Sequence, residues 1–279
     1  PERGSLFFFT KSAKKKTIVL LAAAMSAVAA FGWSQKGHDT VAYIAEKHLS
    51  EAAADSVASL LDGKSPVYWA NWLDNASHTP DYAYTKTWHY KNIDAGTPYD
   101  EAPTIKSGDV VSAAREQIAI LADSVSTRSQ KQLALKILIH LIGDMHQPMH
   151  MGHFTDRGGN NVKVRFFDRD SNLHSIWDGS IMNSGHAWSY TEWQQQLDRL
   201  SPEEERATAA GNIDDWGRET YEIATRVYDY FPSGSRVSYN QIAAWTPVIE
   251  QQLLRGGLRL ARVLNAIFEP DKADSPASF

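Results

Sequence analysis

Seven stretches of the chain repeat apolar residues every three or four positions, which is the spacing of amphipathic helices. They are 38–49, 51–63, 112–125, 131–146, 190–200, 213–231 and 239–268. The period changes only where Val162, Val164 and Phe166 alternate with polar residues, after a glycine pair and before a turn-forming cluster. That change indicates a short hairpin. The pattern therefore predicts a mainly α protein with one β-hairpin.

The first thirty-two residues depart from this pattern. Four lysines between positions 11 and 16 precede an alanine-rich apolar run, which ends with Ala30 and Gly32 at the −3 and −1 positions before Trp33. This is the layout of a secretory signal peptide, and the run is shorter than the roughly 20 residues that span a bilayer. We expect cleavage before Trp33 and a secreted or periplasmic protein, with one domain over 33–268 and a polar, frayed tail over 269–279.

Composition limits how the protein could bind an anionic partner. The formal net charge is −5, and cleavage before Trp33 would change it to −9. A chain this acidic should not hold nucleic acid through a basic surface, so an anionic substrate would need bound cations. The chain has no cysteine, so export brings no disulfides, and any metal must be held by His, Asp, Glu or backbone atoms.

The segment "HLIGDMHQPMH" places three histidines and an aspartate at the end of an apolar helix. His140 and Asp144 are four residues apart and share a helix face. His146 is about 240° around the helix from His140 and should point elsewhere. His150 lies beyond Pro148, where the chain has turned and can return to the same region. A buried carboxylate needs a partner, so this segment is a candidate metal site.

A second pair, His174 and Asp178 in "NLHSIWD", repeats the four-residue spacing. Two such pairs favour a borderline cation such as zinc, held by nitrogen and oxygen ligands. A single pair could equally be a local salt bridge, and a single histidine is more often structural or partly exposed. Spacing alone leaves the reaction open.

At the level of whole motifs, the sequence resembles the zinc-dependent S1/P1 nucleases, which share their metal architecture with bacterial zinc phospholipase C. The resemblance runs from Trp33 to about Phe268. The cysteine-free chain looks more like the bacterial members of the family. Its motifs are "WSQKGH", "YWANWLD", "TWHYKNID", "HLIGDMHQPMH", "RGGNNVKVRF", "NLHSIWD", "DWGRET" and "GGLRLARVLN". The resemblance implies a single multi-helix domain of the phospholipase C/P1 nuclease type that binds three Zn²⁺ ions.

The resemblance also implies nine metal ligands in three groups. They are Asp74, His89 and His140 for one ion, His38 with the amine and carbonyl of Trp33 for a second, Asp144 bridging these two, and His150, His174 and Asp178 for a third. Asp74 and Asp144 are the expected catalytic residues. Cleavage before Trp33 is what would free the amine.

By the same resemblance, the protein is expected to cleave single-stranded DNA and RNA to 5′-nucleotides by attack of a zinc-bound hydroxide, and to act on 3′-nucleotides. We expect a monomer with no stable protein partner and no membrane contact after signal cleavage. Two other functions stay open: a phospholipase C-like phosphodiesterase, and a non-enzymatic zinc-binding protein. The few protein ligands per ion argue against the second, because catalytic zinc sites keep open positions.

Four further residues have expected roles at the site. Tyr90 would stack on a base, as aromatic residues do with single strands, although ordinary core packing is the alternative. Asn92 replaces the base-recognising aspartate of fungal members and offers both a donor and an acceptor. His146 and Asn160 would support the ligands by hydrogen bonds. Ser77 stands where fungal members carry a basic residue.

Overall fold

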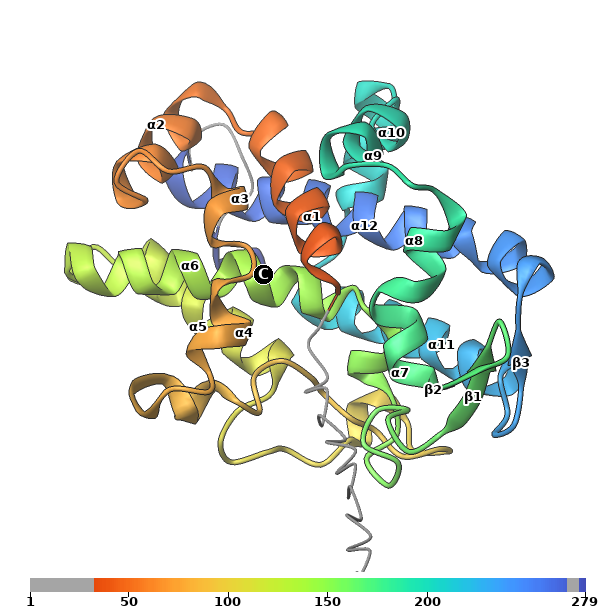
Figure 1. Ribbon diagram of the computed structural model, residues 1–279. Helices are drawn as coiled ribbons and strands as arrows, with labels where there is room; N and C mark the ends of the chain where they lie inside the picture. The colour runs from red at the N-terminus through yellow and green to blue at the C-terminus, as the bar shows by residue number, and fades with distance from the viewer. Residues whose placement is uncertain (1–32, 270–275) are drawn as a thin grey trace, which may run out of the picture.

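Helix α12 (Tyr239–Phe268) runs across the whole molecule, and α1 (Gln35–Lys47) packs against it (Figure 1). The computed structural model describes residues 33–269 and 276–279, so the expected signal peptide over 1–32 lies outside the described residues. A glycine permits the crossing of the two helices: a Cβ at Gly257 would lie 2.4 Å from the side chain of Ile44. The helices therefore approach more closely than larger residues would allow.

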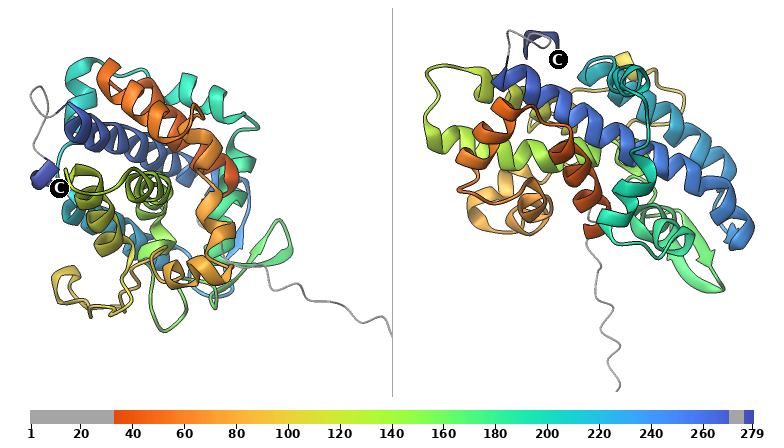
Figure 2. Two further views of the ribbon diagram at one scale, coloured as in Figure 1. Left: turned by 90° about the vertical axis from the view of Figure 1, so that its left-hand side faces the viewer. Right: turned by 90° about the horizontal axis from the view of Figure 1, so that it is seen from above.

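Helices α5 (Val110–Ala122) and α6 (Arg128–Met145) form the second packed pair, and α6 also packs against α12 (Figure 2). Asp109 and Thr127 cap the two helices, each accepting a hydrogen bond from a first-turn backbone N–H. Every residue from position 137 to 145 is buried. Because α6 is enclosed on all sides there, its polar residues must find partners inside the protein.

Helix α11 (Ile213–Tyr230) packs against α5 and against the turn that follows α6. Shorter helices cover the remaining surface. They are α2 (Glu51–Leu60), α3 (Pro66–Trp69), α4 (Trp72–Ala76), α7 (Leu173–Ser175), α8 (Ile181–Gly185), α9 (Tyr190–Leu197) and α10 (Pro202–Ala209). Single helical turns occur at Pro80–Thr85, Tyr99–Glu101, Pro148–Met151, Ile176–Ser180 and Pro276–Ser278.

The predicted hairpin is present as β1 (Lys163–Phe166) and β2 (Arg169–Asn172), which pair antiparallel. The two turn residues, Phe167 and Asp168, have φ of 46° and 64°, and a two-residue turn with both φ values positive matches the twist of the strands. A short strand β3 (Arg236–Val237) adds to β1 in parallel. The sequence did not predict β3, because two residues are too few to show a period.

The mainly α fold predicted from the sequence is confirmed, and a helix occurs in each of the seven periodic stretches. One expectation is corrected at the end of the chain. Phe279 is 9% exposed, and its ring centroid lies 5.8 Å from that of Trp216, so this end of the tail is packed and not frayed. Within the described residues, no helix has both the length and the apolar character needed to cross a membrane.

Candidate metal centre

Four side chains converge on the buried face of α6. His140 and Asp144 are both fully buried, and Nε2 of His140 lies 3.0 Å from Oδ2 of Asp144. Nδ1 of His89 lies 2.9 Å from the same carboxylate oxygen and 3.0 Å from Nε2 of His140. Oδ1 of Asp74, on α4, completes the group at 3.4 Å from His140 and 3.8 Å from His89. The ligand atoms of Asp74, His89 and His140 are close enough together to bind one ion, and those of Asp144, His140 and His38 form a second such group.

His38 enters the same region from the first turn of α1. Its Nε2 lies 3.4 Å from Oδ1 of Asp144, and its ring stacks on that of His140 with centroids 4.1 Å apart. Trp33 is fully buried, and the next residue, Ser34, donates its N–H to the carbonyl of Asp178 at 2.6 Å. The start of the described chain therefore contacts two parts of the site, Asp144 through His38 and Asp178 through Ser34.

The third group follows the end of α6. Nε2 of His174 lies 3.5 Å from Oδ1 of Asp178. The ring of His150 stacks on that of His174 with centroids 5.2 Å apart, and its Nδ1 lies 3.3 Å from Oδ1 of Asp144. Gln147 donates a hydrogen bond to Oδ1 of Asp178 at 2.6 Å. The spacing of four between His174 and Asp178 brings them together as predicted, on a π-helical turn that follows α7.

Backbone carbonyls orient three of the histidine rings. In each case Nδ1 is within hydrogen-bond distance of a carbonyl oxygen, which places the ring proton on that nitrogen and leaves Nε2 free to bind a cation. The pairs are His140 with Ala70 at 2.7 Å, His150 with His89 at 2.5 Å, and His174 with Gly158 at 2.6 Å. These partners could not be predicted from residue types, because any residue supplies a carbonyl.

Charge is balanced around Asp144 in the metal-free chain. Burial alone would raise the pKa of Asp144, but the neighbouring His140 outweighs it and holds the pKa well below its usual range. Burial alone would lower the pKa of His140, but Asp144 and Asp74 raise it well above its usual value. The protonated imidazole of His140 therefore faces the carboxylates of Asp144 and Asp74. A divalent ion that binds at such a site displaces the imidazole proton and takes its place between the ligands.

The third group lacks such a balance. Burial, assisted by His150, lowers the pKa of His174 to about 3, so the ring is neutral at ordinary pH. Burial also raises the pKa of Asp178 well above its usual range, against the opposing hydrogen bond from Gln147. A neutral imidazole beside a carboxylate that lacks a cation is a ligand pair that a metal ion would complete.

Unpaired ligand atoms distinguish this centre from a further His/Asp/Glu group. Nε2 of His38, Oδ1 of Asp144 and Nε2 of His174 are buried without a hydrogen-bond partner. The further group, by contrast, is partly exposed, and both oxygens of Asp198 lie within 2.9 Å of Nε2 of His48. The donor atoms of the centre fit bound cations, whereas His48 and Asp198 are hydrogen-bonded to each other.

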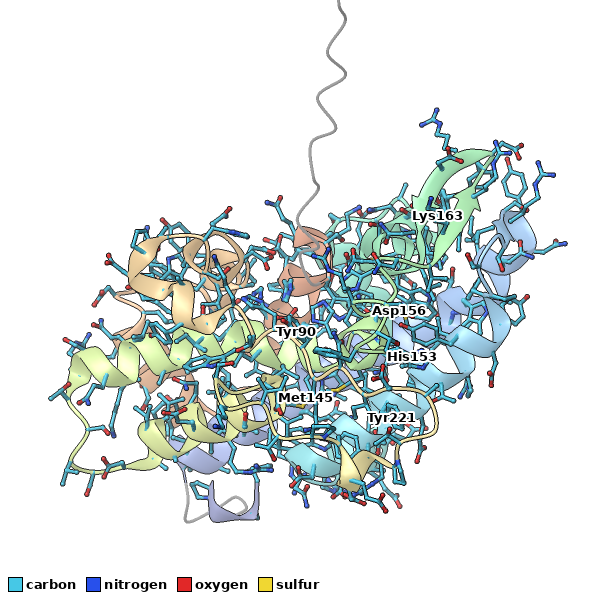
Figure 3. The ribbon with its side chains drawn as sticks, turned by 90° about the horizontal axis from the view of Figure 1, so that it is seen from below. Tyr90, Met145, His153, Asp156, Lys163 and Tyr221 are labelled. Atoms are coloured by element: carbon cyan, nitrogen blue, oxygen red, sulfur yellow. The ribbon has the colours of Figure 1, made fainter. Side chains whose placement is uncertain are left out.

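Two residues of the first group, Asp74 and His89, and two of the third, His150 and His174, line a cavity of about 490 Å³. Tyr90, Asn92 and Asn160, which the sequence predicted near the site, also line it. Tyr90 is half-buried and directly follows the expected ligand His89. It is labelled in Figure 3, which shows the molecule from below relative to Figure 1. Oδ1 of Asn92 is buried without a hydrogen-bond partner. Lys86, Phe154 and Arg157 also line the cavity.

His146 and Asn160 do not hydrogen-bond to the ligands as expected. The ring of His146 bonds to the carbonyl of Ile142 at 2.8 Å and to the guanidinium of Arg259 at 3.0 Å, because at the end of α6 it points away from His140 and Asp144, as its angle from His140 predicted. The Asn160 amide donates to the carbonyl of Arg157 at 2.9 Å. Gln147, which the sequence analysis missed, is the side chain that contacts a ligand.

The helical domain thus holds buried groups of His and Asp side chains that could bind metal, beside a cavity. Residues 33–269 match the family model of the S1/P1 nucleases, and the chain belongs to this family, which is a metallonuclease family. It is 29% identical to Endonuclease 2 of Arabidopsis thaliana, over 85% of this chain and 91% of that protein. It is 28% identical to nuclease S1 of Aspergillus oryzae, over 85% of this chain and 92% of that protein, and 28% identical to nuclease P1 of Penicillium citrinum, over 84% and 97%. These relatives support a nuclease function.

Proposed function

We propose that the chain is a zinc-dependent nuclease that cleaves single-stranded DNA and RNA to 5′-nucleotides and also acts on 3′-nucleotides. The observation that carries this proposal is the set of buried ligand atoms without hydrogen-bond partners beside one cavity. The donors are imidazole nitrogens and carboxylate oxygens, a set that suits zinc. Three ions would be held by the nine residues named above, including the amine and carbonyl of Trp33.

Asp144 has the geometry of a bridging ligand. Its Oδ2 faces His89 and His140 at 2.9 and 3.0 Å, while its Oδ1 faces His38 at 3.4 Å. Two ions could therefore each take one oxygen of the same carboxylate. When bound, zinc supplies activation of water at neutral pH and stabilises the charge that develops on a phosphodiester.

Several residues would select the substrate. A half-buried Tyr90 at the cavity offers a ring on which an unpaired base can stack, whereas a base in a duplex is covered by its neighbours. The Asn92 amide could hydrogen-bond to the edge of that base. The volume of about 490 Å³ is within the range of sites for small ligands and suits one nucleotide unit.

The proposal includes export and maturation of the protein. Cleavage before Trp33 would free the α-amine that the second ion requires, and the protein would then be secreted or periplasmic. Support comes from the signal-like sequence before Trp33 and from the burial of Trp33 beside the site. We further propose that the mature protein is a monomer without a stable protein partner.

Hydrolysis of single-stranded DNA by the zinc-loaded form beginning at Trp33 tests the proposed function. We expect cleavage that a chelator abolishes and that zinc restores, with products carrying 5′-phosphates. A duplex of the same sequence should be cleaved more slowly. Absence of cleavage by a sample with verified zinc content would contradict the proposal and would direct the search to phospholipid substrates and then to zinc storage.

A further inference from the structure

A strained arginine lies at the cavity of the metal centre. Arg157 has φ of 60°, a left-handed conformation that is uncommon for residues other than glycine and is found at functional sites. Its side chain is exposed and lines the cavity. Within residues 33–269 and 276–279, its guanidinium forms no hydrogen bond and no ion pair. The strain is therefore not offset by a contact of the guanidinium itself.

The 153–160 loop that carries Arg157 is held in place by a partly buried network of side chains. Asp156 accepts two hydrogen bonds at Oδ1, from the N–H of Gly159 at 2.6 Å and from the hydroxyl of Tyr228 at 2.8 Å. The ring of His153 stacks on that of Tyr228, with centroids 3.8 Å apart. Figure 3 shows Asp156 and His153 next to each other beside α11. The loop is thus fixed to a long helix of the core.

The same loop is joined to the metal centre. The carbonyl of Gly158 is 2.6 Å from Nδ1 of His174, so the residue after Arg157 orients one of the expected ligands. A Cβ at Gly158 would lie 2.6 Å from the carbonyl oxygen of Met149, which shows how closely the loop approaches the turn after α6. Arg157 is therefore placed at a fixed position relative to the expected third ion.

The charge pattern of the chain indicates what Arg157 binds. Some exposed arginines of this acidic protein form ion pairs, as Arg115 does with Asp214 and Arg218 with Asp100, whereas Arg157 has no such partner among the described residues. Two cationic side chains line the cavity, Lys86 and Arg157, and neither has a partner among the described residues. A guanidinium offers paired N–H donors that match the oxygens of a phosphate.

We propose that Arg157 binds a second phosphate of the substrate strand, adjacent to the phosphate at the metal centre. The inference rests on the proposed nuclease function and extends it. The metal ions would hold the phosphate that is cleaved, while the exposed guanidinium at the cavity holds a neighbouring one. Arg157 is then a specificity residue, which favours oligonucleotides over nucleotides with a single phosphate.

Kinetics of Arg157→Ala on two substrates test this proposal. For a short single-stranded oligonucleotide, we expect KM to rise roughly tenfold, as for loss of a charge-assisted hydrogen bond. The slope of log KM against log salt concentration should fall by about 0.7, the value for one phosphate contact on a single strand. For a 3′-nucleotide, which has one phosphate, kcat and KM should not change.

Arg206→Ala is the matched control. Arg206, on α10, is also exposed and has no hydrogen bond or ion pair among the described residues, but it does not line the cavity, and α10 lies at the opposite side of the molecule from the 153–160 loop (Figure 1). This variant should match the parent protein on both substrates. An unchanged salt slope in Arg157→Ala would overturn the proposal, as would equal losses on both substrates, since these would indicate a role in holding the loop.

A binding measurement separates this inference from the proposed function. Fluorescence anisotropy of a labelled phosphorothioate oligonucleotide reports binding to the zinc-loaded protein without hydrolysis. If the parent protein hydrolyses neither substrate, the proposed function fails, and the anisotropy salt slopes of parent and Arg157→Ala still decide the role of Arg157. Equal slopes in that assay would contradict it.

Discussion

Gly143 and His38 meet where α6 and α1 approach each other, and a Cβ on Gly143 would lie 2.6 Å from Nδ1 of His38. The imidazole of His38 therefore occupies the space that a side chain on α6 would fill. This close approach places His38 beside Asp144. Asp144 lies four residues after His140, on the same face of α6. The geometry of the centre therefore depends on glycine at position 143 as well as on the ligands.

Gly143→Ala is predicted to displace His38 and to reduce the bound zinc by one equivalent per chain, with at least a tenfold loss of nuclease activity. Alanine in place of glycine ordinarily favours a helix, so a loss cannot come from helix propensity. Metal analysis and thermal unfolding of the same samples would check this. Unchanged zinc content would show that His38 can shift without leaving the site.

Gln147→Leu is predicted to weaken metal binding at the third group by about ten- to a hundredfold, as found for loss of a hydrogen bond to a ligand. The amide of Gln147 is the hydrogen-bond donor to Asp178, and leucine keeps the volume without the donor. Gln132→Leu, at the other end of α6, provides the control, because Gln132 bonds to Leu60 and Asp62 away from the centre. Titration of zinc into both variants would give the affinities, and equal values would refute the assigned role.

The contribution of His146 to the stability of the metal-free protein is predicted to be lost as the pH decreases below about 6.5. Burial and the charge of Arg259 lower the pKa of His146 well below its ordinary value. The unfolded chain therefore takes up this proton first, and the stability from neutral His146 is present above pH 6.5 and is lost on acidification. His146→Asn should reduce the slope of unfolding free energy against pH by up to about 1.4 kcal/mol per pH unit. Urea unfolding with a chelator present between pH 7.5 and 5.5 measures both slopes, and parallel slopes would rule out this role.

Tyr90→Ala is predicted to raise KM for single-stranded DNA by about tenfold or more, since stacking on an aromatic ring is worth ~1–3 kcal/mol per base. Tyr90→Phe keeps the ring and should retain most of the affinity. If Tyr90 were only a packing residue, Tyr90→Ala would lower the thermal stability and leave KM nearly unchanged. Measuring both quantities for the two variants distinguishes stacking from packing.

The sequence predicted those parts of the centre that depend on helix periodicity. His140 and Asp144 converge because one helix places residues four apart on the same face, and the pair His174 and Asp178 follows the same rule. Asp74 could be assigned only through the family motifs, because it comes from a separate short helix and carries no local signal. Tertiary folding determines such convergence.

Other features could not be predicted because they depend on atoms that every residue has. Backbone carbonyls orient three histidines, and β3 joins the sheet with two residues. The direction of His146 was predicted: its angle of about 240° from His140 indicated that the ring points away from the ligands, and the structure places it at Arg259. The hydrogen bond to a ligand that its place in the histidine-rich motif suggested is absent among the described residues.

Native mass spectrometry of the purified form beginning at Trp33, compared with a form that retains one additional residue, tests the central claim most directly. The account predicts three zinc ions per chain in the first form and two in the second, because an amide nitrogen in place of the free amine removes a ligand of the second ion. A first form that binds one ion or none under saturating zinc would contradict the three-ion centre, and equal occupancy in the two forms would remove the amine of Trp33 from it.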